Sequence, residues 1–212
     1  MSRAALASWA GVALAVLLAL ASLFAATRRM GHSVWFDESQ THLIASQPTY
    51  SAIAEMARQI RPYPPLFFVV AHHMLQLRPD ETGPRLASAL FGALGVVAVF
   101  LLGRRLAGGR AGLLAACFYA LTPGAFRYFV DGNPYTLLAL ASTLSTLMLF
   151  RAAASGRWRD WLWYTVFALM GMAAHSLFVF HAAAQLMGGF YLVRRRAASG
   201  DSGAYRGLTG AG

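Results

Sequence analysis

The chain of 212 residues has too few charged residues to cover a soluble domain of its size. Hydrophobic residues make up 58% of it and charged residues only 12%, about half the usual share. This composition excludes an ordinary soluble enzyme and predicts an integral membrane protein. The net charge of +10 does not indicate a nucleic-acid partner, because most arginines lie at the ends of apolar runs, where they orient membrane proteins. The single cysteine, Cys117, excludes an intrachain disulfide.

The first apolar run extends from Leu6 to Ala26 and follows Arg3. It is long enough to cross a hydrocarbon core of about 30 Å as a helix. A cleaved signal peptide is the alternative, since the run ends in small alanines. Its length and the bulky Leu23 and Phe24 before a cleavage point favour a retained signal anchor.

Six further apolar runs follow, and arginine clusters separate them in pairs. The runs are Pro64–Leu77, Leu86–Leu102, Ala111–Val130, Tyr135–Phe150, Trp161–Ala174 and Leu177–Val193. The clusters are Arg104–Arg105–Arg110, Arg151–Arg157–Arg159 and Arg194–Arg195–Arg196. Because two runs separate each cluster from the next, all three clusters lie on one face, which the positive-inside rule makes cytoplasmic.

A cytoplasmic N-terminus then requires an even number of crossings before Arg104, so one of the first three runs does not cross. The shortest, Pro64–Leu77, begins with two prolines and contains His72 and His73, which is typical of an interfacial or re-entrant segment. We therefore expect an all-α bundle of about six transmembrane helices with both ends cytoplasmic. Arg28 and Arg29 oppose this orientation, but the three later clusters outweigh them.

The first extracytoplasmic loop, residues 27–85, is the longest polar segment. Within it, Ser51–Ile60 places apolar residues at helical spacing, which predicts an amphipathic helix on the membrane surface. Residues 1–196 form one transmembrane module. The composition of residues 197–212, rich in Gly, Ala and Ser, predicts a disordered tail.

Two adjacent carboxylates in this loop, Asp37 and Glu38, are the foremost candidates for chemistry. They follow Trp35 and Phe36, an aromatic pair suited to the headgroup level. Ionisable groups held against a membrane are costly, which favours a functional role. Asp37 as the N-cap of a helix over residues 38–46, with Gln40 completing a capping box, is an equally weighted interpretation.

Other polar residues on the same face have structural alternatives. Asp131 lies in a Val130–Pro134 loop, where Asp, Gly, Asn and Pro together also predict a tight turn. Arg61 and Arg85 bracket the re-entrant segment and suit phosphate oxygens, although both arginines could extend to ordinary lipid headgroups. His72 and His73 lack local partners for a metal site, and packing is the favoured interpretation of His175.

Four ordered stretches resemble the GT-C membrane glycosyltransferases, in particular bacterial enzymes of the protein-O-mannosyltransferase and aminoarabinose-transferase superfamily. The stretches are Trp35–Glu38, Pro64–Phe68, Arg85–Gly92 with Leu102–Leu106, and Leu121–Pro123 up to Asp131 and Pro134–Tyr135. The resemblance implies an integral protein of the bacterial cytoplasmic membrane with an extracytoplasmic active face.

The resemblance also implies the chemistry. The donor is a sugar on a polyprenyl phosphate, and the acceptor is a lipid, a glycan or a protein. Asp37, supported by Glu38, is the catalytic position, and it would also hold a divalent metal ion if one takes part. Arg85 and Arg61 would contact the donor phosphate, with Asp131 and Tyr135 forming a second acidic site.

Two departures from the family pattern motivate an alternative function. Asn133 occupies the place of an arginine in an acidic–X–Arg–X–Tyr pattern, and the chain is shorter than the usual helical array. We therefore expect a truncated module, or one that a partner subunit completes. The alternative is a catalytically inactive fragment or lipid-binding membrane subunit. A small transporter is less favoured, because the spans carry almost no charge.

Overall fold

In the computed structural model, which describes residues 3–199, every regular element is a helix. The helices are α1 (Arg3–Thr27), α2 (Phe36–Ala45), α3 (Tyr50–Ile60), α4 (Leu66–Leu77), α5 (Thr82–Leu121), α6 (Pro123–Val130), α7 (Tyr135–Ser155), α8 (Trp158–Ala174) and α9 (Phe178–Ser199). The all-α fold predicted from the apolar runs is confirmed. The predicted tail, residues 197–212, lies outside the described residues except for the end of α9.

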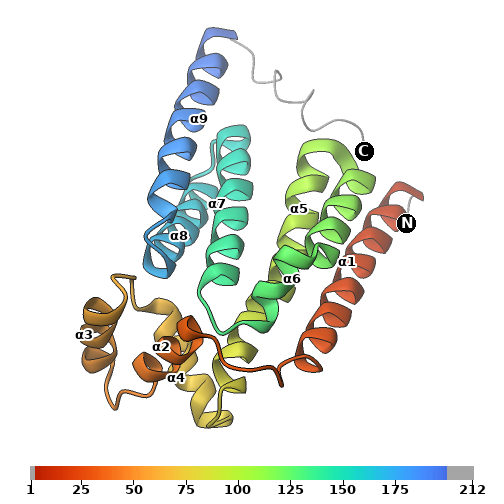
Figure 1. The fold of residues 1–212 in the computed structure, drawn as a ribbon. Coiled ribbons are helices and arrows are strands. Elements are labelled where there is room, and N and C mark those ends of the chain that lie inside the picture. Colours follow the sequence, from red (N-terminus) through yellow and green to blue (C-terminus); the bar gives the residue numbers. More distant parts are fainter. Residues whose placement is uncertain (1–2, 200–212) are drawn as a thin grey trace.

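Three helices of the described part are long and apolar enough to cross a membrane: Trp9–Thr27 of α1, α5 and α7. The backbone of α5 leaves the helical region at Ala107 and Gly108, where Gly108 has a φ of 87°. Glycine tolerates this conformation because it has no Cβ. The chain reverses there, so α5 forms two antiparallel arms (Figure 1).

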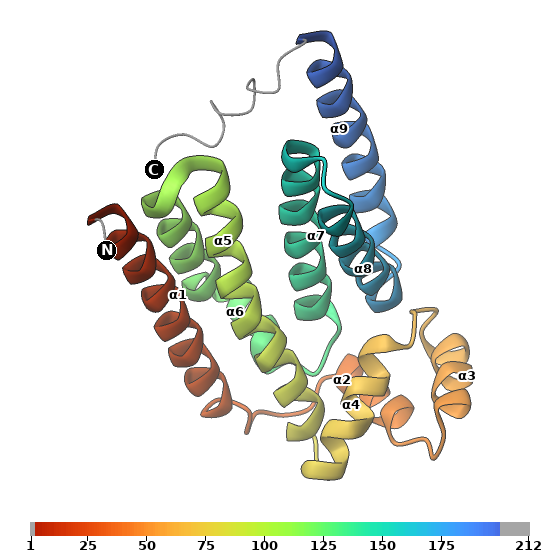
Figure 2. The same ribbon diagram turned by 180° about the vertical axis from the view of Figure 1, so that it is seen from behind.

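The two arms of α5 pack closely near their turn. A Cβ on Gly103 would lie 2.8 Å from Cα of Gly112, so only glycine allows this approach. Together with α1, α7, α8 and α9, the arms form a bundle of elongated helices (Figures 1 and 2). These helices correspond to five of the predicted spans and to the first part of Ala111–Val130, whose remainder forms the separate helix α6. Helices α8 and α9 lie outside the three that meet the length and hydropathy criteria.

The short helices α2, α3 and α4 lie together at one end of this bundle (Figures 1 and 2). The turn of α5 and the α7–α8 connection, which carry the first two arginine clusters, lie at the opposite end (Figure 1). Arg151 and Asp160 form an ion pair of 3.3 Å across that connection. The fold therefore separates the arginine-rich turns from the loop that contains Asp37 and Glu38.

The outer helices confirm two predictions about the first loop. Helix α3 is amphipathic: Ile53 and Ala57 are fully buried, whereas Glu55 and Arg58 are exposed. Helix α4 is only 12 residues long and buries Phe67 and Phe68 against its neighbours. It is too short to cross a hydrocarbon core, which needs about 20 residues.

The predicted N-cap of α2 is wrong. The helix begins at Phe36, so Trp35 rather than Asp37 occupies the cap position. The side chain of Glu38, at the third helical position, accepts a hydrogen bond of 3.1 Å from the Trp35 backbone N–H. Glu38 therefore provides the capping carboxylate, and the side chain of Asp37 is left for other contacts.

Candidate functional site

Glu38 and Arg85 form a buried ion pair where α2 meets the first turns of α5. The Nε and Nη2 of Arg85 donate to the two carboxylate oxygens of Glu38 at 2.7 and 2.8 Å. The remaining donors of Arg85 bind the backbone carbonyls of Met30, His32 and Ser33. Arg85 is fully buried and Glu38 is 4% exposed. This bidentate pair joins the loop after α1 to α2 and α5.

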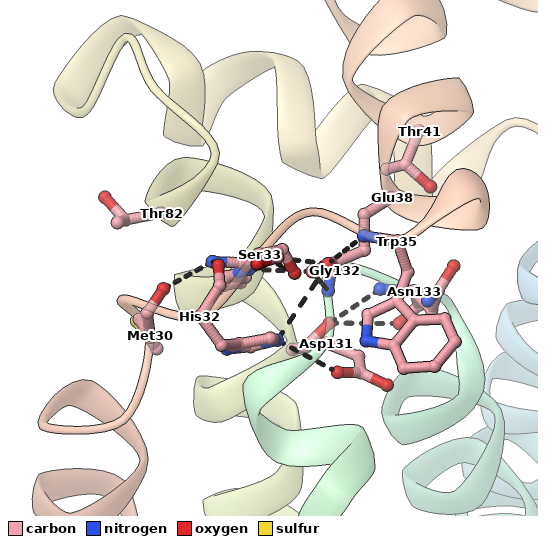
Figure 3. A network of polar contacts seen from close by, with 12 residues as sticks. Met30, His32, Ser33, Trp35, Glu38, Thr41, Thr82, Asp131, Gly132 and Asn133 are labelled. Atoms are coloured by element: carbon pink, nitrogen blue, oxygen red, sulfur yellow. Dashed lines mark hydrogen bonds and ion pairs between the residues drawn. The ribbon is translucent and has the colours of Figure 1, made fainter.

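Glu38 remains ionised despite its burial. Burial alone raises the pKa of a carboxyl group, but the hydrogen bonds from Arg85 and from the Gly132 and Trp35 amides outweigh it. The pKa of Glu38 therefore lies below its ordinary value. The Gly132 amide donates at 2.9 Å, so Glu38 also fixes the turn between α6 and α7 (Figure 3).

Asp37 faces a different arginine and is far more accessible. Its side chain is 51% exposed, and its Oδ2 lies 3.3 Å from Nη2 of Arg61. Arg61 itself is buried, and its Nη1 donates to the Asp37 backbone carbonyl at 3.1 Å. The structure thus places the two adjacent carboxylates in two environments: Glu38 within the fold, and Asp37 at the surface beside a held guanidinium.

Arg61 also reaches the turn between α6 and α7. Its Nη1 donates to Oδ1 of Asn133 at 3.2 Å, and its guanidinium lies over the Tyr63 ring at 4.9 Å. Asn133 is held in place by Ser88 of α5, whose hydroxyl donates to the Asn133 carbonyl at 3.0 Å. A guanidinium therefore lies beside Asn133, although the local sequence has no arginine at that position.

Asp131 lies on the other side of Glu38, in the same turn. Its Oδ1 is 3.5 Å from Nε2 of His32 (Figure 3), and its Oδ2 is 3.4 Å from Nε of Arg127. Burial and the neighbouring Glu38 charge raise the pKa of Asp131 above its ordinary value, against the opposing effects of Arg127 and His32. The predicted turn at Asp131 is present, and it brings a second carboxyl group to the site.

Tyr135 lies on the Arg61 side of the site, separate from Asp131. Its ring centroid is 5.4 Å from that of His175 and 4.9 Å from that of Tyr128. His175 is buried and also lies 4.3 Å from the Tyr63 ring, as the packing interpretation predicts. Tyr135 thus contacts aromatic rings, whereas Asp131 contacts His32 and Arg127.

Three residues of the site, His32, Arg127 and Ser88, were not among those predicted from the sequence. His32 contacts Asp131 across 99 positions of the chain, which no local pattern indicates. Its position in the loop just before the aromatic pair was the available signal. His72 and His73, by contrast, pack against Tyr50 of α3 rather than joining this site.

The arrangement offers three chemical elements at one end of a membrane bundle. Asp37 is an accessible carboxylate, Arg61 is a fixed cation beside it, and the Glu38–Arg85 pair holds the surrounding loops. Trp35 and Phe36 are exposed next to Asp37, where a lipid or a sugar can approach. A carboxylate beside a guanidinium can accept a proton while the cation stabilises a departing anion.

Comparison with known proteins identifies the family. The model of the dolichyl-phosphate-mannose-protein mannosyltransferase family matches residues 62–211, which is more than half of the chain. The match includes Arg85, Asp131 and Tyr135 but begins after Asp37 and Arg61. Neither curated proteins nor solved structures gave a match. The chain is an integral membrane protein and belongs to the dolichyl-phosphate-mannose-protein mannosyltransferase family, within the GT-C glycosyltransferases.

Proposed function

We propose that the protein transfers a sugar from a polyprenyl-phosphate donor to an extracytoplasmic acceptor hydroxyl on a lipid, a glycan or a protein. The observation that carries this proposal is the accessible carboxylate of Asp37, held 3.3 Å from Arg61 at the end of the bundle opposite the arginine-rich turns. The family supports glycosyl transfer, and the positive-inside rule favours an extracytoplasmic face for this end.

In the proposed reaction Asp37 is the general base. It takes the proton of the acceptor hydroxyl as the hydroxyl oxygen attacks the anomeric carbon of the sugar. The bond between that carbon and the phosphate oxygen breaks, and the lipid phosphate leaves with the bonding electron pair. The configuration at the anomeric carbon inverts, because attack and departure occur on opposite faces.

Arg61 is the proposed contact for the donor phosphate. Its guanidinium is buried, fixed by Asn133 and adjacent to Asp37, and a planar guanidinium suits phosphate oxygens. Arg85 makes five hydrogen bonds within the protein, to Glu38 and to three backbone carbonyls. We therefore assign Arg85 and Glu38 to positioning the loops and Arg61 to the phosphate.

The test is Asp37→Asn, which keeps the shape of the side chain but removes its basicity. Membrane vesicles containing the wild-type protein or the variant receive radiolabelled polyprenyl-phosphate mannose, and label leaving the lipid phosphate is measured. General-base catalysis contributes about 10²–10⁴-fold, so we expect transfer to fall by at least about 100-fold. Glu55→Gln is the matched control, because Glu55 is an exposed carboxylate on α3 paired only with its helix neighbours.

Undiminished transfer by a folded Asp37→Asn variant would eliminate the assigned base. Transfer that is absent from the wild-type chain itself, with the labelled lipid still bound, would instead support the alternative of a lipid-binding membrane subunit.

A further inference from the structure

Three metal-ligating side chains from distant parts of the chain converge beside the Glu38–Arg85 pair. His32 comes from the loop after α1, Glu38 from α2, and Asp131 from the turn after α6. Nε2 of His32 lies 3.5 Å from Oδ1 of Asp131 and 4.0 Å from Oε2 of Glu38 (Figure 3). One ligand atom from each side chain lies within 4.8 Å of the other two.

The orientation of the His32 ring directs one nitrogen toward the two carboxylates. Its Nδ1 lies 3.1 Å from the backbone carbonyl of Arg29, and a carbonyl can only accept a hydrogen bond. Nδ1 therefore donates to this carbonyl, and the other ring nitrogen, Nε2, faces the two carboxylates. Nε2 and one oxygen of each carboxylate thus lie within 4.8 Å of one another, as the ligand atoms of one metal ion do.

The surroundings resemble the supporting contacts of a metal site. A histidine that binds a metal almost always donates its other ring N–H to a carbonyl or carboxylate, and a carboxylate ligand is itself hydrogen-bonded. Here the Arg29 carbonyl orients His32, while Arg85 and the Trp35 and Gly132 amides orient Glu38.

Asp131 has room to bind a ligand. Its side chain is more than nine-tenths buried and points into the cluster, yet its two ion-pair contacts are no closer than 3.4 Å. One of them, Arg127, is 57% exposed, and its guanidinium also lies 4.8 Å from the Trp35 ring centroid.

We propose that His32, Glu38 and Asp131 bind a divalent transition-metal ion, of which Zn²⁺ and Mn²⁺ are the representatives. The imidazole nitrogen favours these ions over Mg²⁺ and Ca²⁺, which prefer oxygen ligands. Metal–ligand distances of about 2.0–2.2 Å require the three side chains to draw closer, and His32 is 32% exposed and held by its hydrogen bond to the Arg29 carbonyl. Three protein ligands leave a coordination position open.

This site differs from the one expected from the sequence, which placed any metal at Asp37. The Asp37 carboxylate faces Arg61 and does not belong to the cluster. The proposed metal site therefore does not depend on the proposed function. It is tested by metal binding and not by sugar transfer.

The test is titration of the purified full chain, free of affinity tags, with Zn²⁺, Mn²⁺ and Mg²⁺ by calorimetry in detergent, and with Mn²⁺ by electron paramagnetic resonance. We expect one saturable site for Zn²⁺ or Mn²⁺ and weaker binding of Mg²⁺. His32→Ala and Asp131→Asn should each weaken the site at least about tenfold, as the loss of even a supporting contact does. His73→Ala and Asp37→Asn should bind like the wild type.

Binding that is absent, or that His32→Ala leaves unchanged, would overturn the proposal. The proposal would also be overturned if ¹⁵N NMR showed two protons on the His32 ring at pH 7.5 in a wild-type protein that binds no metal. That result would mean that the protonated His32 ring, and not a metal ion, supplies the positive charge beside Glu38 and Asp131. An Asp37→Asn variant that binds metal normally but loses transfer would separate the metal site from the proposed base.

Discussion

Glu38 and Asp131 are neighbouring buried carboxyl groups whose surroundings act in opposite directions. Hydrogen bonds from Arg85 and two amides lower the pKa of Glu38 in spite of its burial, whereas burial and the Glu38 charge raise the pKa of Asp131. The ionised form of Glu38 therefore stabilises the fold, and the ionised form of Asp131 opposes it.

We expect Glu38→Gln to destabilise the protein, because it leaves the buried Arg85 without its counter-ion. Breaking a buried pair costs about 3–5 kcal/mol in the free energy of unfolding. The measurement is chemical unfolding in detergent with EDTA present. Asp131→Asn is the control, and it should not lower stability at pH 7.

The lowered pKa of Glu38 predicts how the stability of the fold changes with pH. Because the folded-state pKa of Glu38 is below its ordinary 4.5, its stabilisation is present above pH 4.5 and is lost as the pH falls through the folded-state pKa. The wild type should therefore lose stability in that acid window more steeply than Glu38→Gln. Parallel curves would show that the Glu38–Arg85 pair does not hold the loops together.

At the scale of elements, α5 and α6 place the turn that contains Asp131. Gly92 of α5 lies against Phe129 of α6, and a Cβ on Gly92 would fall 2.7 Å from the Phe129 ring. Phe129 is fully buried and precedes Asp131 by two residues. The missing side chain at Gly92 thus sets how closely α6 and its turn approach the site.

Gly92→Ala should therefore push α6 away from α5. Overpacking a close contact costs about 1–3 kcal/mol, and we expect a matching loss of thermal stability together with reduced transfer. Gly124→Ala on α6 is the control, because a Cβ there meets nothing within 4 Å. Equal effects of the two substitutions would contradict the packing role of Gly92.

The helices could be predicted from the sequence because the hydrophobicity of each apolar run is enough to indicate that the run is buried in lipid. The amphipathic pattern of α3 and the short length of α4 are likewise local properties. The site could be predicted only in part. Asp37 and Glu38 stand out among eight acidic residues, but their different environments depend on Arg61 and Arg85, which tertiary packing brings from 24 and 47 positions away.

The role of His32 and the start of α2 could not be predicted from local sequence patterns. A single histidine in a loop has no pattern of its own, and only the fold brings it beside Asp131. The N-cap was assigned to Asp37 because its side chain is a favoured cap. In the structure the helix instead begins two residues earlier, at Phe36, and Arg85 and Gly132 hold the Glu38 carboxylate at its third position.

At the scale of the whole molecule, the bundle has two chemically different ends. One carries arginine-rich turns, and the other carries α2, α3, α4 and the candidate site (Figure 1). Arginine at helix ends faces the cytoplasm in membrane proteins. A site at the other end meets a lipid-linked donor at the outer surface, with the lipid tail in hydrocarbon and the sugar in water.

Site-directed labelling of two cysteines tests this orientation most directly. In a Cys117→Ala background, Ser39→Cys places a thiol on the exposed side of α2, and Gly109→Cys places one at the exposed turn of α5. We expect a membrane-impermeant maleimide to label Ser39→Cys in intact cells and to label Gly109→Cys only after permeabilisation. Labelling of Gly109→Cys in intact cells, with Ser39→Cys protected, would contradict an extracytoplasmic site.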